Sequence, residues 1–293
     1  MGADGPRVVA APRPGWQARG VRVLLAGASG VVGRPLLPRL LAAGHEVVAV
    51  ARRPVPGVET VVADVVTDPL RLPAVDAVVV ELTALPRSLG PGARRGFPEN
   101  DRVREVGVPR LLDAAGCPRV VVQSMLALAG ADGPPAVRRA ARALAVMEDA
   151  AAARPEGVVL RHGLLLGPGT WYDEGGAYAR LARRGALPLA GDGSPRSAYV
   201  HVDDAAEAAV VALTAPPGTY EVAGEPVAAR ELWTAFAART GARAPRALPR
   251  PVLAAAAGAY AAWFATTDRP PGAVGRLPGW EPRVPWRDAL PGA

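Results

Sequence analysis

The sequence predicts an α/β protein with a doubly wound parallel sheet and a smaller, mainly helical carboxyl-terminal region. Three observations predict this fold. Apolar runs of strand length alternate with stretches of helical length through the first half of the chain. These runs are apolar at nearly every position, as strands covered on both faces must be. The first run also breaks into regularly spaced glycines, which is typical of a strand that turns sharply into a helix.

The glycines Gly27, Gly30 and Gly33 follow the apolar residues 22–26 at intervals of three. A turn that passes beneath a pyrophosphate needs free backbone N–H groups and no side chains at the point of approach. The sequence therefore predicts a Rossmann-type dinucleotide site in which this turn contacts the phosphates. The residues expected to bind the cofactor there are Gly27, Ser29, Gly30, Val31, Val32 and Gly33.

The helix after the turn should run to about Ala43, with Gly44 as its carboxyl-terminal cap. Pro35 and Pro38 predict a kink or a short break within it, because an interior proline costs a helix about 3 kcal/mol.

The second strand, residues 45–50, leads to Arg52 and Arg53. A site selective for NAD carries Asp or Glu there to bind the ribose 2′-hydroxyl. Two guanidinium groups favour a 2′-phosphate instead, through bidentate, charge-assisted hydrogen bonds, so the expected cofactor is NADP(H). The alternative is that both arginines belong to a solvated loop.

Three further strands are expected at residues 58–66, 76–84 and 119–125, with a loop at 90–98 and a helix at 108–116 between the last two. This alternation implies right-handed crossovers in a parallel sheet. Ligands bind such sheets at the carboxyl ends of the strands, where Thr83 and Ser124 fall.

Four later segments carry a family resemblance. Residues 160–169 read LRHGLLLGPG, 199–206 read YVHVDDAA, 220–224 read YEVAG and 279–287 read GWEPRVPWR. With the glycine turn, their order and spacing resemble the extended short-chain dehydrogenases/reductases, also called the NAD-dependent epimerase/dehydratase family. The resemblance spans residues 22–290. It implies further cofactor contacts from Asp64 at the adenine amino group, Leu82 and Thr83 at the nicotinamide ribose, His162 beside the nicotinamide, and Gln123.

The chain departs from this family at the catalytic acid. The family uses Tyr-x-x-x-Lys, in which the tyrosine protonates the alkoxide left by hydride transfer and the lysine lowers the pKa of that tyrosine. The helix expected at residues 134–148 contains no Tyr, and the whole chain contains no Lys. Arg104 also stands where the family has Asn. The usual acid is therefore absent.

Ser124 is the remaining catalytic candidate, because its hydroxyl is placed to bind a substrate carbonyl; the alternative is a polar strand terminus. His162 is either an acid near neutral pH or a loop histidine bonded to the backbone. Asp203 or Asp204 should cap the helix that begins near Ala205. Substrate contacts are expected from the side chains around the mouth of the cleft, which are Met125, Trp171, Tyr172, Tyr199 and His201.

The organisation follows from these elements. Residues 1–20 read as a disordered arm, 21–165 as an NADP-binding Rossmann domain and 166–293 as a substrate-binding region, with 199–224 returning to the Rossmann sheet. Helices at 230–241 and 252–266 should place their aromatic residues, among them Tyr260, in the core of that region.

Composition restricts the function classes. The net charge of +7 comes from scattered arginines without a basic stripe, which argues against nucleic acid. No apolar run is long enough to span a membrane and no signal peptide is evident, so a cytoplasmic protein is expected. The single Cys117 has no metal-ligand spacing around it, and no metal is expected. Nothing in the sequence fixes the oligomeric state.

Taken together, the sequence favours an NADPH-dependent ketoreductase that acts on an aromatic polyketide or a similar secondary metabolite in antibiotic biosynthesis. The Arg-, Ala-, Gly- and Pro-rich composition is typical of a GC-rich, actinobacterial genome. The chain also looks similar to the ketoreductases that tailor aromatic polyketides, such as angucyclinone 7-ketoreductases of the simocyclinone type. Two alternatives stay open: a regulator that binds NADP(H) without chemistry, and a non-redox cyclase, dehydratase or isomerase on the same fold.

Overall fold

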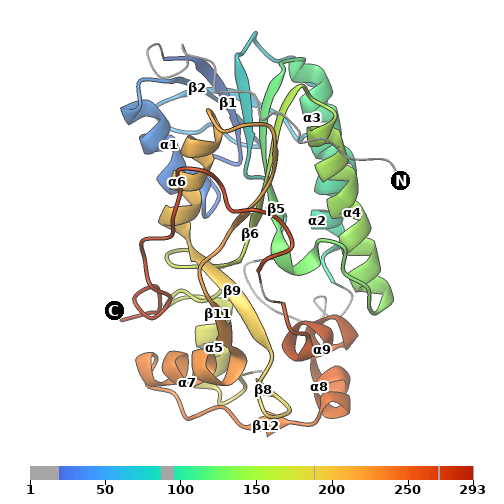
Figure 1. Ribbon diagram of the computed structural model, residues 1–293, viewed down its shortest axis with the longest axis vertical. Coiled ribbons are helices and arrows are strands. Elements are labelled where there is room, and N and C mark those ends of the chain that lie inside the picture. The colour runs from blue at the N-terminus through green and yellow to red at the C-terminus, as the bar shows by residue number, and fades with distance from the viewer. Residues whose placement is uncertain (1–19, 87–95, 188, 270, 293) are drawn as a thin grey trace, which may run out of the picture.

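A seven-stranded sheet, parallel throughout, forms the centre of the computed structural model, which describes residues 20–86, 96–187, 189–269 and 271–292 (Figure 1). Its strand order confirms the predicted doubly wound fold, because the chain reverses direction across the sheet between β1 and β4. The strands in spatial order are β10 (Gly218–Val222), β6 (Glu156–His162), β5 (Arg119–Met125), β4 (Ala77–Val80), β1 (Arg22–Ala26), β2 (Glu46–Ala51) and β3 (Glu59–Val62).

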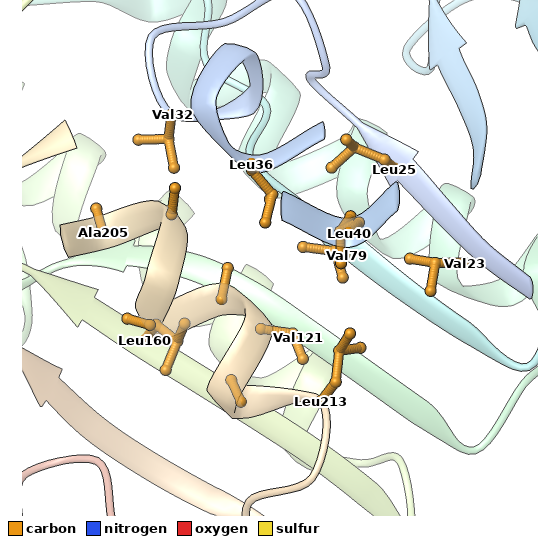
Figure 2. Packing of buried hydrophobic residues seen from close by; sticks show 14 of the residues in the cluster. Val23, Leu25, Val32, Leu36, Leu40, Val79, Val121, Leu160, Ala205 and Leu213 are labelled. Carbon is orange, nitrogen blue, oxygen red and sulfur yellow. The ribbon is translucent and has the colours of Figure 1, made fainter. Parts of the chain in front are cut away.

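Helices cover both faces of this sheet. One face packs against α1 (Gly33–Ala42) and α6 (Val202–Ala212), and Figure 2 shows Leu36 and Leu40 of α1 over Val23, Leu25 and Val79. The other face packs against α3 (Val108–Ala115) and α4 (Pro135–Ala152), and Tyr260 and Trp263 of α9 (Ala259–Thr266) extend the same apolar cluster. Burial on both sides explains why β1, β2 and β4 are almost uniformly apolar.

Helix α1 differs from its prediction, because it runs unbroken from Gly33 to Ala42. Pro35 is the third residue of the helix, where a backbone N–H has no intrahelical acceptor in any case. Pro38 lies inside the helix, and the apolar packing of Leu36 and Leu40 holds the segment in place around it. Gly44 follows with a φ of 84°, as the cap prediction requires.

Two of the predicted strands are shorter than expected. The third spans Glu59–Val62 and the fourth spans Ala77–Val80, so Asp64, Leu82 and Thr83 follow the strands that were expected to contain them. The predicted loop at 90–98 lies mostly outside the described residues, as does nearly all of the predicted arm at 1–20.

The carboxyl-terminal half adds a smaller body at one end of the sheet, where the parallel strands have their carboxyl ends. Its core gathers Leu166, Tyr199, Leu232 and Phe236. The elements of this body are β7 (Leu164–Leu166), β9 (Arg196–His201) and β11 (Pro226–Ala228) in one sheet, β8 (Leu189–Ala190) and β12 (Ala247–Leu248) in another, and the helices α5 (Ala177–Arg183), α7 (Ala229–Arg239) and α8 (Arg250–Ala257).

The predicted helix at 252–266 is two helices. Gly258, at a φ of 92°, separates α8 from α9 and turns the chain. Two side chains of α9, Tyr260 and Trp263, then join the apolar cluster that also contains the buried residues of α4. Within residues 199–224, β9 belongs to the small sheet, whereas α6 covers the large sheet and β10 forms its edge.

Among the described helices, none combines the length and apolarity that a membrane crossing needs.

Candidate cofactor and substrate cleft

A cleft of about 1860 Å³ opens at the carboxyl ends of β1, β4, β5 and β6, between the large sheet and the smaller body. A drug-sized ligand occupies a site of roughly 300–1,000 Å³. The cleft is therefore large enough for a dinucleotide together with a second small molecule. Across the described part of the chain, no group of three His, Cys, Asp or Glu residues is placed to hold a metal ion.

The glycine turn forms one wall of this cleft and has no room for side chains. Gly27 has a φ of 99°, and a Cβ on it would lie 2.5 Å from the backbone oxygen of Glu81. A Cβ on Gly33 would lie 2.0 Å from the oxygen of Gly27, so this glycine permits α1 to start directly against β1. Gly33 does not line the cleft, whereas Gly27, Ser29, Gly30, Val31 and Val32 do. This bare turn fits the pyrophosphate of a dinucleotide.

The two arginines after β2 differ in position. Arg52 lines the cleft and Arg53 does not, although both are exposed. Asp64 also lines the cleft. It follows β3, the edge strand next to β2. Its Oδ1 accepts a hydrogen bond from the backbone N–H of Val66 at 2.8 Å, which fixes the carboxylate in a turn beyond β3.

Two side chains in the cleft wall have every polar atom enclosed by protein and without a hydrogen-bond partner among the described residues. They are the carboxyl of Glu81, which follows β4, and the imidazole of His162, which ends β6. Burial raises the pKa of Glu81 well above its usual value and lowers the pKa of His162 to about 3. Buried polar groups are nearly always paired, so two enclosed and unpaired groups make this part of the cleft wall unusual.

His162 has neither of the two roles that the sequence suggested, an acid near neutral pH or a loop histidine bonded to the backbone. It is the last residue of a buried strand, and neither ring nitrogen bonds to described backbone. With a pKa of about 3 it carries no proton to donate near neutral pH. Leu82, Thr83 and Gln123 line the cleft close to it in the sheet, as expected of residues at strand ends.

Ser124 is fully buried at the end of β5 and its hydroxyl donates to Oε1 of Glu148 on α4, at 2.5 Å. The same carboxylate binds Arg161 of β6 through two hydrogen bonds, at 3.0 and 2.6 Å. Ser124 and Arg161 are paired in register on the two strands, which brings all three groups together. The hydroxyl proton of Ser124 is thus directed at Glu148, and toward the cleft this oxygen can accept a hydrogen bond.

Helix α4, which carries the catalytic acid in the family that the sequence resembles, contributes nothing to the described wall of the cleft. The face that it buries is entirely apolar, consisting of Val137, Ala140, Ala143, Leu144, Met147 and Ala151. The wall on this side comes instead from α2 (Pro98–Arg102), from the π-helical turn η2 (Val103–Gly107) and from Tyr260 of α9. Sequence reasoning had placed neither Arg104 nor Tyr260 in the site, although both line the cleft.

Aromatic side chains line the part of the cleft that faces the smaller body. Trp171, Tyr172 and Tyr199 all lie there, as predicted for a substrate surface, together with Met125. Tyr172 and Tyr199 are more than nine-tenths buried, and Tyr172 stacks on Trp233 at 5.7 Å between ring centroids. Trp171 is less buried and donates its ring N–H to the oxygen of Pro86 at 2.8 Å.

His201 lies outside the cleft, in contrast to the prediction. It ends β9, and its Nδ1 accepts the backbone N–H of Asp203 at 3.2 Å, so His201 caps α6. The predicted caps have other partners. Asp203 forms an ion pair with Arg39 of α1 at 2.8 Å. Asp204 is buried and accepts the backbone N–H groups of Arg283 and Val284. Helix α6 begins at Val202, so the cap falls on the residue before it.

Comparisons with known proteins agree with this architecture. The model of the NAD dependent epimerase/dehydratase family matches residues 23–84 and 139–223. A 3-diazoavenalumate denitrifying reductase from a Streptomyces species is 37% identical to the chain, covering 92% of this chain and 99% of the relative.

Solved structures show the same fold at lower identity. The human epimerase family protein SDR39U1 with NADPH is 24% identical with a TM-score of 0.66, covering 92% of this chain and 97% of that one. DesIV, a dTDP-glucose 4,6-dehydratase from Streptomyces venezuelae with NAD and TYD bound, is 20% identical with a TM-score of 0.67, covering 92% and 94%. The identity and coverage of the Streptomyces reductase, together with the match to the family model, establish that this chain belongs to the NAD-dependent epimerase/dehydratase family.

Proposed function

We propose that this chain is an NADPH-dependent reductase of an aromatic small molecule. Reduction of this substrate requires no proton from a tyrosine–lysine pair of the protein. One observation supports this above all others. The cleft retains the bare glycine turn of a dinucleotide site, while the helix that should supply the acid presents an apolar face and does not line the described cleft.

The preference for NADPH rests on Arg52. Its side chain lines the cleft just after β2, where the adenosine ribose of a bound dinucleotide lies in this fold. In the described structure Arg52 makes no ion pair, so its guanidinium is free to bind a 2′-phosphate. Arg53 contributes through its charge, since it does not line the cleft.

The reduced nicotinamide, when bound, supplies a hydride. A ketone that accepts the hydride becomes an alkoxide and requires one proton to give the secondary alcohol. Where a phenol or enol is conjugated to that ketone, the substrate holds the negative charge as a resonance-stabilised phenolate and takes its proton from water. An aromatic polyketide ketone has this chemistry, and the aromatic lining at Trp171 and Tyr172 suits its rings.

A diazo group is the second candidate acceptor, and the 37% identical denitrifying reductase favours it. An aryl diazonium that receives a hydride at its terminal nitrogen becomes an aryl diazene. The diazene loses N₂ as its N–H hydrogen passes to the ring carbon, so the group is replaced by hydrogen without any proton from the protein. An acceptor of this kind explains the absence of the acid as directly as a phenolic ketone does.

Single-turnover oxidation of NADPH, followed by nicotinamide absorbance, tests the proposal against two matched sets of aromatic substrates. One set carries a ketone conjugated to a phenol, and the other carries a diazo group beside the phenolic oxygen. A ketone product gains two hydrogens in mass, whereas a diazo product loses N₂ and gains hydrogen. Oxidation of NADPH with either set, and the matching product mass, is the expected result.

The same measurements identify the two alternatives. A regulator binds NADPH tightly but does not oxidise it, whichever acceptor is offered. A non-redox enzyme converts a substrate without any change in nicotinamide absorbance or gain of hydrogen. Either result contradicts the proposed function.

A further inference from the structure

Arg104 is a buried cation that lacks a partner. Its side chain lies in η2, where it is 5% exposed, and it lines the cleft. Within the described residues no carboxylate forms an ion pair with its guanidinium and no acceptor forms a hydrogen bond with it. Its guanidinium nitrogens are not fully enclosed by protein atoms, so they face the open volume of the cleft.

The nearby carboxylates are committed to other cations. Asp101, one helical turn before Arg104, is held by Arg139 of α4 at 2.8 Å. Glu148 is held by Arg161 at 2.6 Å and accepts the Ser124 hydroxyl. Burial lowers the pKa of Arg104, and its electrostatic interactions with Tyr260, Asp101 and Glu148 oppose that shift. An arginine in such surroundings remains charged, so the cleft contains an uncompensated positive group.

The walls beside Arg104 are aromatic and flat. Tyr260 lies against Phe97 edge to face, with 5.6 Å between the ring centroids, and both side chains line the cleft. Phe97 also meets Trp171 at 5.5 Å, which links this corner to the aromatic lining on the smaller body. A planar aromatic ring with an ionised oxygen on it matches both features of this corner.

We propose that Arg104 binds an ionised oxygen on the aromatic ring of the substrate, a phenolate, and that the Tyr260 hydroxyl lies beside it as a hydrogen-bond donor. The inference rests on the proposed function and deepens it, because it names the group that holds the charge left on the substrate. The cation comes from η2 and the hydroxyl from α9, so neither group comes from the usual catalytic helix.

The test uses a pair of small probes with the NADP⁺-loaded protein. 4-Nitrophenol ionises to a coloured phenolate, whereas 4-nitroanisole has the same shape but cannot ionise. Wild-type protein should bind the phenolate in preference to the ether and should lower the pKa of the bound phenol, seen as colour at a pH where the free probe is colourless. Equal affinity for the two probes, or no binding of 4-nitrophenol, overturns the proposal.

Variants separate the charge from the packing. Arg104→Met should weaken phenolate binding about ten- to a hundredfold, the scale of a charged hydrogen bond, and leave 4-nitroanisole unaffected. Arg104→Lys should restore part of the preference. The matched control is Arg102→Met, because Arg102 is exposed and does not line the cleft. Equal weakening of both probes by Arg104→Met means that Arg104 only packs, and overturns the proposal.

The two proposals fail in different ways. Probe binding requires no turnover, so a protein that never oxidises NADPH can still show the phenolate preference. Conversely, a protein that oxidises NADPH with an aromatic acceptor but ignores the ionisation of 4-nitrophenol retains the proposed function and loses the role of Arg104. Should Arg104→Met fail to fold, the wild-type probe pair and Arg104→Lys still decide the question.

Discussion

The hydroxyl of Ser124 donates a hydrogen bond to Oε1 of Glu148, 2.5 Å away on α4, and Glu148 in turn holds Arg161 on the neighbouring strand. This contact joins the end of β5 to α4, the helix that covers it. The serine that the sequence offers as a catalytic group lines the cleft, but its hydroxyl is engaged in a hydrogen-bonded network with Glu148. Its hydroxyl hydrogen is not available to a substrate in this geometry.

Ser124→Ala should therefore have a small effect on turnover. The variant loses one hydrogen bond to a charged acceptor, which costs stability about 1.5–3 kcal/mol. We expect the rate of NADPH oxidation at saturating substrate to fall less than about tenfold, because the substrate holds its own charge. A loss above about a thousandfold, the scale of a dedicated acid or oxyanion donor, contradicts both this expectation and the substrate-assisted proposal.

Gly33→Ala should disturb the glycine turn. The added Cβ would meet the backbone oxygen of Gly27 at 2.0 Å and Cα of Ala28 at 2.7 Å, and neither atom can rotate away. We expect a loss of about 3 kcal/mol in the free energy of unfolding, measured in urea, and a more than tenfold loss in NADPH affinity.

The control for this change is Gly44→Ala at the other end of α1. Gly44 has a φ of 84° but nothing within 4 Å of its Cβ position, so alanine there pays only backbone strain of about 1–2 kcal/mol. NADPH affinity should stay unchanged. Equal losses of affinity in the two variants would mean that general destabilisation, and not the shape of the turn, limits binding.

Arg52→Ala should weaken NADPH binding by about ten- to a hundredfold and leave NADH binding nearly unchanged, since only NADPH carries the 2′-phosphate. Arg53→Ala is the matched comparison. Because Arg53 does not line the cleft, its removal should cost less, and that smaller cost should vanish at high salt. Calorimetric titration with both nucleotides measures all four affinities. If Arg52→Ala lowers the affinity for NADH as much as that for NADPH, the arginine does not read the 2′-phosphate.

His162 should make the protein less stable in mild acid. Burial lowers its pKa from 6.5 to about 3 in the folded state, so the unfolded chain binds the proton first. The contribution of the neutral ring is complete above about pH 6.5 and is lost as the pH falls from there toward 3. Between about pH 7 and about pH 5 the free energy of unfolding should fall by about 2 kcal/mol more in wild type than in His162→Gln. Identical pH dependence of the two proteins would show that the ring is not desolvated in the folded state.

Much of the sheet could be predicted from the sequence, because its signals are local. The apolar run of β5 has the predicted bounds, 119–125, and α1 ends at the predicted glycine. The spacing of Gly27, Gly30 and Gly33 sufficed to predict a turn without room for side chains. Strand ends were predicted less accurately, since β4 stops at Val80 whereas the predicted strand continued to Ala84.

The remaining features depend on contacts between distant segments. The sequence showed that Arg104 replaces an asparagine, but nothing local showed that α4 would withdraw from the cleft wall. Tyr260 was assigned to the core of the small region, yet after the break at Gly258 it joins the apolar cluster that contains α4. His201 became a helix cap instead of a pocket residue because α6 starts earlier than its acidic residues suggest.

The π-helical turn η2 sets the orientation of the side chains around it. A π turn is equivalent to a single residue added within an α-helix, so it leaves both flanking helices on their axis while rotating one relative to the other by about 100°. The step of one extra residue in this segment therefore decides which of its side chains face the cleft. Deletion of the exposed Val106 should reverse that step and turn Arg104 away from its present neighbours.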